Sequence, residues 1–332
     1  MAGGVLPRLS HRFGASPLLM LILRRVGLAL ATLVIVSAVV FTLVQLLPDD
    51  AAQAILGQNA TPQAVAVLRH ELGLDQPMLE RYFSWIGRLL HGDFGVSLAN
   101  GLPVSRLLQD RLQNTMFLFA LSAVISIPVA FLLGLLAATM RGSLFDRISN
   151  VVALGMISSP QFLLAYVLIY VFAIKYPWFP SSADIRPGMP LQDMIYVSIL
   201  PAITLSAIVI AYMMRMTRAA ILDVLGNDYI RMAVLKGMSP MRIIVRHALP
   251  NAIAPIAVVV ALLLAYLIVG VVIVEVVFVY PGLGQLLVDA VGKRDITVVQ
   301  AVSMIFAAAY IMFNMIADVV SIVSNPRLLH PR

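Results

Sequence analysis

Residues that could support catalysis or metal binding are few in this chain of 332 amino acids. Cysteine is absent, which excludes disulfides and thiolate chemistry. The histidines are scattered and fit no metal-ligand spacing; they are His11, His70, His91, His247 and His330. The sequence contains no HExxH zinc motif, no Ser/His/Asp cluster and no GxxxxGKS/T phosphate-binding loop. We therefore expect a protein that is not an enzyme and that holds neither a metal nor a nucleotide itself.

The composition is that of an integral membrane protein. Hydrophobic residues make up 61% of the chain and charged residues only 12%, whereas soluble domains carry roughly a quarter charged residues. A helix that crosses a bilayer needs about 20 apolar residues. Runs of that length occur at 26–47, 112–140, 148–174, 194–214, 248–274 and 296–317. The sequence thus predicts an all-α, polytopic fold with six transmembrane helices.

The basic residues indicate how the chain is oriented. A net charge of +7 would suggest nucleic-acid binding in a soluble protein, but in a membrane protein Lys and Arg accumulate in cytoplasmic loops. Of the 23 Lys and Arg residues, 14 lie on the side of the two termini and 9 on the other. Without segment 48–111, since long loops are translocated largely regardless of charge, the ratio is 14 to 4. Both terminal segments, 1–25 and 324–332, are therefore predicted to be cytoplasmic, and no nucleic-acid partner is expected.

Segment 48–111 is the one sizeable region outside the apolar runs, and this orientation puts it on the outer face. Apolar residues at helical spacing predict helices over 62–72 and 77–90. Glycines that suit turns stand at Gly73, Gly92, Gly95 and Gly101. Two roles are open: a cap over the first two spans, or a surface that receives a partner or substrate.

The cytoplasmic loop within 215–250 has the pattern of two short helices. Asn227 or Asp228 can cap the first helix, and Gly237 suits its left-handed end. Ser239 is placed to cap the second helix, which begins with proline. A basic helix–turn–helix of this kind could lie on anionic lipid. DNA reading is disfavoured, because membrane spans adjoin the loop directly and leave no separate domain.

The same loop resembles a known family. The pattern Ala233-x3-Gly237-x9-His247-x-Leu249-Pro250 resembles the EAA loop of ABC-importer permeases. Segments similar to the dipeptide/oligopeptide subfamily, and to the B-type permease of its pair, are 228–239, 246–251, 72–77 with 92–97, 274–284 and 286–295. The resemblance runs in order over about 24–327, and 112–323 corresponds to the family's transmembrane core.

The chain departs from the family pattern in three places. Leu47-Pro-Asp-Asp-Ala51 stands where the family has Leu-Pro-Gly-Asp-Pro, and Asn325-Pro-Arg327 replaces Asp-Pro-Arg. Arg231 occupies the position of the acidic residue that names the EAA loop. The peptide subfamily often has a basic residue there.

The resemblance implies a fold, a set of partners and a division of labour. Such proteins have the type I ABC importer permease fold in the bacterial inner membrane and pair with a second, similar permease. Two cytoplasmic ATPase subunits bind ATP and Mg²⁺, and an external solute-binding protein delivers di- or oligopeptides. Relatives handle nickel complexes, glutathione or opine-like solutes. The EAA loop docks in a groove of the ATPase, and the docking candidates here are Tyr229, Ala233, Lys236, Gly237, Met238 and Arg242.

Two carboxylates at the ends of apolar runs are further candidates, because ionisable groups in or near a membrane are costly. Glu275 could line the translocation path as an external gate or contact the binding protein. It could equally be an interfacial carboxylate paired with Arg294 or Lys293. Asp318, late in the sixth run, is expected to pair with a cytoplasmic arginine such as Arg327.

Ser158 and Gln161 are predicted to line a cavity, because Pro160 frees a backbone carbonyl inside the third run. A secondary transporter would need buried coupling charges or an internal repeat, and the two halves of this chain do not match. A membrane enzyme would need a catalytic cluster that the sequence lacks. A permease subunit of an ATP-driven importer is therefore the favoured function.

Overall fold

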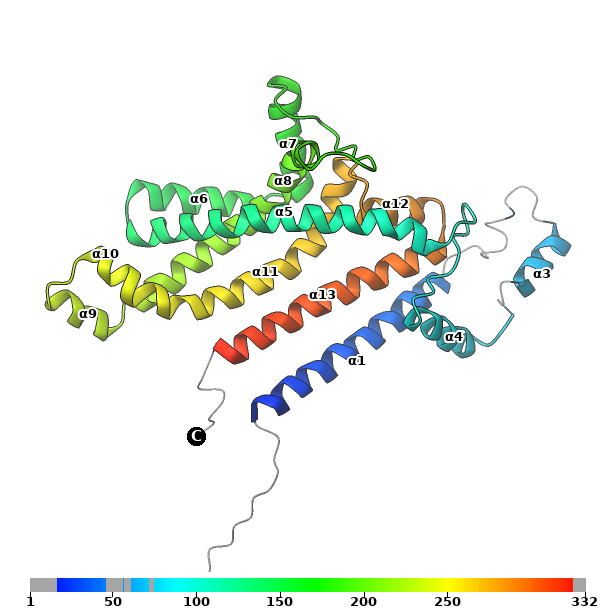
Figure 1. Cartoon of the computed structure of the whole chain (residues 1–332), viewed down its shortest axis with the longest axis horizontal. Coiled ribbons are helices and arrows are strands. Elements are labelled where there is room, and N and C mark those ends of the chain that lie inside the picture. The colour runs from blue at the N-terminus through cyan, green and yellow to red at the C-terminus, as the bar shows by residue number, and fades with distance from the viewer. Residues whose placement is uncertain (1–16, 46–55, 57–60, 72–74, 325–332) are drawn as a thin grey trace, which may run out of the picture.

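A computed structural model describes residues 17–45, 56, 61–71 and 75–324, and the regular secondary structure of these residues is helical (Figure 1). Among these residues no strand occurs, apart from an isolated bridge between Val96 and Pro103. The helices are α1 (Pro17–Gln45), α3 (Pro62–Glu71), α4 (Met78–Leu90), α5 (Val104–Thr139), α6 (Leu144–Ser158), α7 (Gln161–Ile169), η2 (Tyr170–Lys175), α8 (Leu191–Leu225), α9 (Asp228–Leu235), α10 (Pro240–Ile243), η3 (Ile244–Ala248), α11 (Leu249–Val277), α12 (Leu283–Gly292) and α13 (Ile296–Ser324). The all-α prediction is confirmed.

Five helical stretches in the described part of the chain are long and apolar enough to cross a membrane. They are α1, α5, α8, α13 and the continuous run Pro240–Val277, which joins α10, η3 and α11. A sixth crossing exists only as a bent pair, because Leu144–Ser158 and Gln161–Lys175 meet at an angle of 108°. With that pair counted as one, the six predicted crossings are present.

The third crossing is not the straight helix predicted over 148–174. α6 ends at Ser158, and α7 begins three residues later. Pro160 has no amide hydrogen and disfavours helical geometry in the residue before it. Ser159 is accordingly extended, with a ψ of 136°. Figure 1 shows the result: α6 runs beside α5, whereas α7 turns away from it.

Other helices extend beyond the apolar runs that predict them. α5 begins at Val104 instead of 112, and α8 continues past 214 to Leu225. The added turns contain charged residues such as Arg106 and Arg218, which a purely apolar criterion excludes although the backbone hydrogen bonds continue through them. The helices therefore reach past the apolar layer.

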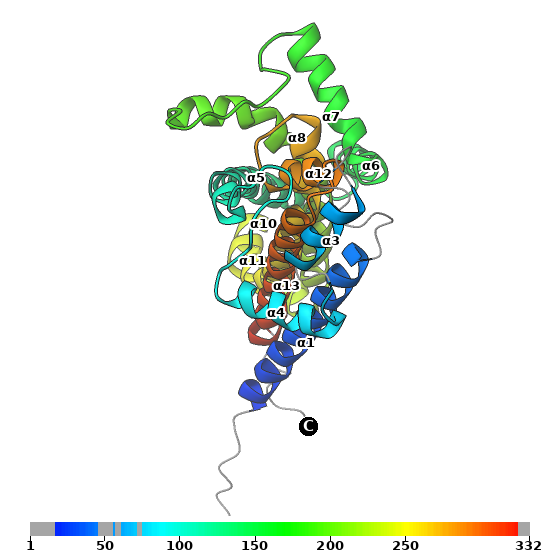
Figure 2. The same cartoon turned by 90° about the vertical axis from the view of Figure 1, so that its right-hand side faces the viewer.

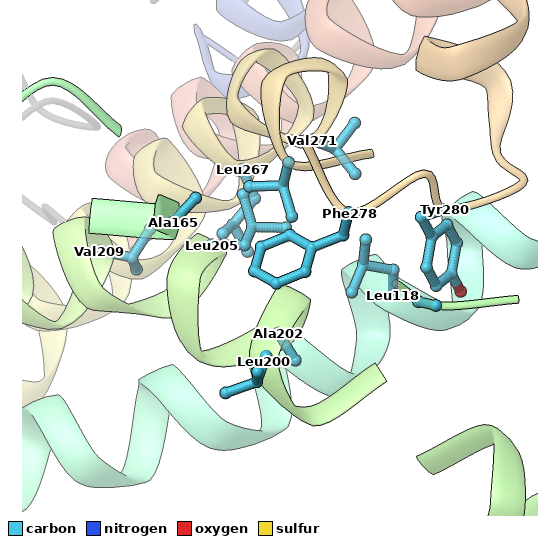
Figure 3. Packing of buried hydrophobic residues seen from close by; sticks show 12 residues of the cluster. Leu118, Ala165, Leu200, Ala202, Leu205, Val209, Leu267, Val271, Phe278 and Tyr280 are labelled. Carbon is cyan, nitrogen blue, oxygen red and sulfur yellow. The ribbon is translucent and has the colours of Figure 1, made fainter. Parts of the chain in front are cut away.

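α8 is the central helix of the bundle. Of its most apolar stretch 61% is buried inside the chain, against 28% for α5 and for α13. Figure 3 shows Leu118 of α5, Leu205 of α8 and Leu267 of α11 gathered around Phe278, and all four side chains are buried. α5, α8 and α11 thus form the core that positions the loops at both ends.

The two ends of the bundle carry different segments. The start of α1, the end of α13 and the short helices α9 and α10 lie toward one end in Figure 1. Helices α3, α4 and α12 lie at the other end, which faces the viewer in Figure 2. This separation agrees with an even number of crossings. The placement of the first end in the cytoplasm stays a prediction.

The predicted helices over 62–72 and 77–90 are found as α3 and α4. α4 packs on α1: Tyr82 Oη lies 2.7 Å from Ser37 Oγ, and the ring of Trp85 contacts that of Phe41. These contacts favour the role of a cap over the first span.

The expected glycine turns are partly seen. Gly92, Gly95 and Gly101 adopt positive φ angles, as turns require. Gly73 and the departures at 47–51 and 325–327 lie outside the described residues.

Candidate functional site

The loop after α8 folds as two short helices, as predicted, and Gly237 ends the first of them, as predicted. The predicted side-chain caps are not seen, because neither Asn227 nor Ser239 makes a capping hydrogen bond. Gly237 has a φ of +74°, its N–H donates to Val234 O, and Met238 N donates to Ala233 O at 3.2 Å. This pair of bonds is a Schellman stop. The side chain of Asn227 does not cap α9. It turns back to donate to carbonyls of α8.

The two helices enclose a small apolar core of their own. Ile230, Ala233 and Ile243 are buried together, with Leu225 and Met238 packed against them. The small size of Ala233 therefore serves the packing of α9 on α10. Of the six docking candidates, Tyr229, Lys236, Gly237 and Arg242 are exposed, Met238 is half-buried and Ala233 is buried.

The loop also carries an exposed apolar patch that none of its sequence motifs marks. Its members are Met232, Val234, Leu235 and Met241, and Leu235 and Met241 are 79% and 70% exposed. Basic side chains border it, among them the exposed Lys236. A patch of this kind, apolar with a polar rim, is typical of a protein or membrane contact. The sequence does hold a sign of this patch: α9 has more apolar residues than the one buried face with Ile230 and Ala233 can hold, so some of them must be exposed.

The break between α6 and α7 opens onto a pocket of about 320 Å³. Ser159, Pro160 and Gln161 line it together with residues of α8 and α11 such as Tyr266. Ser158 is exposed and is not among the lining residues. None of the described residues that line this pocket is charged. The Gln161 amide lies close to the backbone of α11 at Gly270. A Cβ atom added to Gly270 would lie only 3.0 Å from Gln161 Nε2.

Glu275 lies inside the chain, not at its surface. Its side chain is fully buried, and Thr115 Oγ1 donates to it at 2.6 Å. The backbone amides of Gly284 and Gln285 donate to its second oxygen at 2.6 and 3.3 Å. We call Thr115, Glu275, Gly284 and Gln285 the outer polar cluster. Nothing in the local sequence around Thr115 marks it as the partner of a carboxylate 160 positions later.

Two further contacts hold the turn after α11 against α5. Asn114 Nδ2 donates to Pro281 O at 2.8 Å, and the buried Tyr280 donates its hydroxyl to Asn114 O at 2.7 Å. Thr115 Oγ1 also accepts from Leu283 N at 2.8 Å. The outer end of α5 is therefore tied to this turn by both backbone and side-chain groups.

Asp318 pairs with an arginine, as predicted, but the arginine belongs to α1. Arg25 Nη1 lies 3.0 Å from its carboxylate, while Arg327 is outside the described residues. Both side chains are substantially exposed, at 48% for Arg25 and 39% for Asp318. Such pairs contribute about 0–1 kcal/mol, so this contact is a minor tie between α1 and α13.

The sequence matches known transport proteins over nearly the whole chain. Residues 130–330 match the family described as binding-protein-dependent transport system inner membrane component, and residues 18–119 match the N-terminal region described for such membrane components. A "probable peptide ABC transporter permease protein y4tP" from Sinorhizobium fredii is 39% identical over 308 residues, which are 92% of this chain and 98% of that protein. The glutathione transport system permease protein GsiC of Escherichia coli K12 is 38% identical over 305 residues, 92% of this chain and 97% of the relative.

These similarities agree with the helix bundle, whose crossings fit the type I ABC permease fold. Both relatives are permease subunits by name, and each is covered almost completely. The chain is a multi-pass protein of the inner membrane, and it is the permease part of an ABC importer. It belongs to the family of binding-protein-dependent transport system inner membrane components.

Proposed function

We propose that this chain and a second, homologous permease subunit form the membrane path for di- or oligopeptides. An external solute-binding protein delivers the solute, and two cytoplasmic ATPase subunits supply the energy. ATP and Mg²⁺ bind to those subunits, and this chain holds no cofactor. The exposed patch on α9 and α10 carries the proposal, because it offers a partner both apolar contacts and a basic rim.

Docking on the ATPase uses the end of this loop. Tyr229, Lys236, Gly237 and Arg242 are exposed there, beside Leu235. Ala233 and Met238 contribute indirectly, because they pack in the apolar core that holds α9 against α10. A groove with apolar walls and acidic or carbonyl groups at its rim would complement this surface.

The path for the solute passes the pocket at the break in the third crossing. Gln161 supplies amide groups, and the uncharged lining suits solutes that differ in side-chain charge. Ser158, next to the break, is proposed to face the path once the second permease covers this side. Glu275 acts as part of the external gate, by holding the turn after α11 in place.

The outer segment 91–103, between α4 and α5, is a suitable docking site for the binding protein. Asp295, at the start of α13, accepts hydrogen bonds from Ser97 Oγ, Leu98 N and Val298 N. The bonds from Ser97 and Leu98 fix the segment on the start of α13, so that it presents a defined surface.

Coupling is tested with a matched pair of substitutions in the full transporter, reconstituted with its ATPase subunits and binding protein. Leu235→Glu changes the last residue of α9, and Leu90→Glu changes the last residue of α4 at the opposite end. The two side chains are almost equally exposed, at 79% and 81%. We expect Leu235→Glu to abolish uptake and Leu90→Glu to leave it intact.

Gly237→Glu and Gly188→Glu form a second pair, since both glycines have similar positive φ angles (+74° and +79°) and open space around them. We expect only the first substitution to stop uptake. Normal uptake by both Leu235→Glu and Gly237→Glu would refute the docking surface.

The solute class is tested by the ligand that the cognate binding protein carries. The same architecture would serve glutathione, which the name of one relative favours, or a nickel complex or opine-like solute. Uptake of a labelled dipeptide that excess glutathione does not reduce would support the peptide assignment. Uptake of glutathione alone would overturn it in favour of the non-peptide alternative.

A further inference from the structure

A second group of polar contacts lies at the other end of α5. Arg218 of α8 donates from Nε and Nη2 to the two carboxylate oxygens of Asp146, at 2.6 and 2.8 Å. Gly142 N and Asn150 Nδ2 donate to the same carboxylate, each at 2.9 Å. We call Gly142, Asp146, Asn150 and Arg218 the inner polar cluster. It joins the first turn of α6 to α8.

The geometry of this pair fixes orientation as well as distance. Two parallel bonds from a planar guanidinium to a carboxylate hold both groups in one plane. The Asp146 side chain is 5% exposed and that of Arg218 24%, so solvent ions screen the attraction weakly. Ser143 Oγ caps α6 by accepting from Asp146 N. The first turn of α6 therefore cannot rotate independently of α8.

The backbone of α5 is held against the same part of α8. A Cβ on Gly134 would lie 2.7 Å from Met214 O and from Thr217 Cβ, so the two helices touch without an intervening side chain. Thr217 is the neighbour of Arg218 in the chain. The inner ends of α5 and α6 are thus both bound to one turn of α8 and form a single body with it.

This body lies between α9 and α10, which we call the docking loop, and the break in the third crossing. Arg218 is seven residues before Leu225, about 10 Å along the helix, and Leu225 packs on the core of α9 and α10. Asp146 is twelve residues before Ser158, about 18 Å along α6. At that point α6 meets the pocket.

We propose that Asp146 and Arg218 are positioning residues for energy coupling. They make α6 follow α8 when the docking loop moves, and α6 then moves the bent third crossing that lines the pocket. The inference rests on the proposed function, because it takes α9 and α10 as the elements moved by the ATPase. Neither residue is among those that line the pocket at the break or form the exposed patch on α9 and α10.

The test compares uptake with ATP hydrolysis in the reconstituted transporter. Asp146→Asn and Arg218→Met each remove one charge. Asparagine keeps the size and shape of aspartate, and methionine keeps the apolar stem of arginine without its guanidinium group. Coupling between sites is typically worth about 5–150-fold, so we expect each change to lower uptake about tenfold while ATP hydrolysis stays within about twofold. The double variant should be no worse than either single variant, since the two residues act as one contact, and Asp146→Glu should restore part of the uptake.

Three comparisons separate this inference from simpler explanations. Asp318→Asn breaks a different interhelical ion pair, between α1 and α13, and should leave uptake unchanged. Parallel losses of uptake and ATP hydrolysis in Asp146→Asn would mean that the pair only stabilises the fold, and would overturn the inference. If Leu235→Glu abolishes uptake and Asp146→Asn does not, the link alone is wrong. If Leu235→Glu and Gly237→Glu both transport normally, the proposed docking surface is wrong.

A spectroscopic measurement tests the mechanical step directly. The chain contains no cysteine, so spin labels can be attached at Val151→Cys on α6 and Asp228→Cys on α9, both exposed and both outside the proposed docking surface. We expect one narrow distance distribution that stays the same with and without ATP, because the two helices move together. Asp146→Asn should broaden it. A distribution that already changes with ATP in the otherwise unaltered protein would refute a rigid link.

Discussion

Thr115→Val tests whether a single hydroxyl fastens the outer end of α5 to the turn after α11. Valine has nearly the shape of threonine but cannot form hydrogen bonds. The substitution removes the donor to Glu275 at 2.6 Å and the acceptor for Leu283 N at 2.8 Å. Both partners are buried inside the chain, so water cannot replace the lost bonds.

The cost follows from the two groups that lose their partner. Each buried polar atom left unsatisfied costs about 1–3 kcal/mol, which gives about 2–6 kcal/mol for the pair. We expect the lower half of that range, because Gly284 and Gln285 continue to donate to the same carboxylate. Thr115→Ser keeps the hydroxyl and loses one methyl group, worth about 0.8 kcal/mol.

The free energy of unfolding is measured by titrating the purified protein in mild detergent micelles with a denaturing detergent. The fluorescence of Trp85 and Trp178 reports unfolding at the two places where they lie. Thr115→Val should be destabilised clearly more than Thr115→Ser. Equal losses for the two variants would show that the methyl group matters and the hydroxyl does not, and would refute the outer polar cluster as a structural tie.

Three other substitutions give separate tests. Gly134→Ala forces a methyl group into the backbone of α8 and should lower the free energy of unfolding by about 1–3 kcal/mol, measured in the same titration. Gly282→Ala places a Cβ against the Glu275 carboxylate, so it should destabilise the protein at least as much; a neutral effect would mean that the turn relaxes freely. Asp295→Ala removes the acceptor of the Leu98 amide and should speed hydrogen exchange of that amide about tenfold or more, as expected for local opening. Unchanged exchange would contradict the anchoring of the outer segment.

The sequence was informative wherever a local pattern determines the structure. The apolar runs located α1, α5, α8, α11 and α13, because a crossing helix must be apolar over most of its length. Gly237 was recognised as a helix stop because its conformation is costly for other residues. The outline of the docking loop, two short helices with a stop at Gly237, therefore follows from the sequence alone.

Contacts between distant residues could not be predicted in the same way. The partner of Glu275 is 160 positions away, and that of Asp318 is 293 positions away; one threonine or arginine among many gives no local signal. Pro160 was visible, but whether a proline kinks a helix or breaks it by 108° depends on what packs around it. The sequence likewise shows that Ala233 is small but not what packs against it. In the structure its methyl group lies in the apolar core between α9 and α10.

The two polar clusters have a consequence for how this bundle can move. Within lipid, apolar surfaces gain little by meeting each other, so packing and polar contacts decide which helices stay together. α5 takes part at both ends, through Thr115 in the outer cluster and, just beyond its end, Gly142 in the inner one. A movement that displaces one cluster relative to the other must therefore bend α5. Pro128 lies between them and removes one backbone hydrogen bond, which makes that turn the least costly place for the bend.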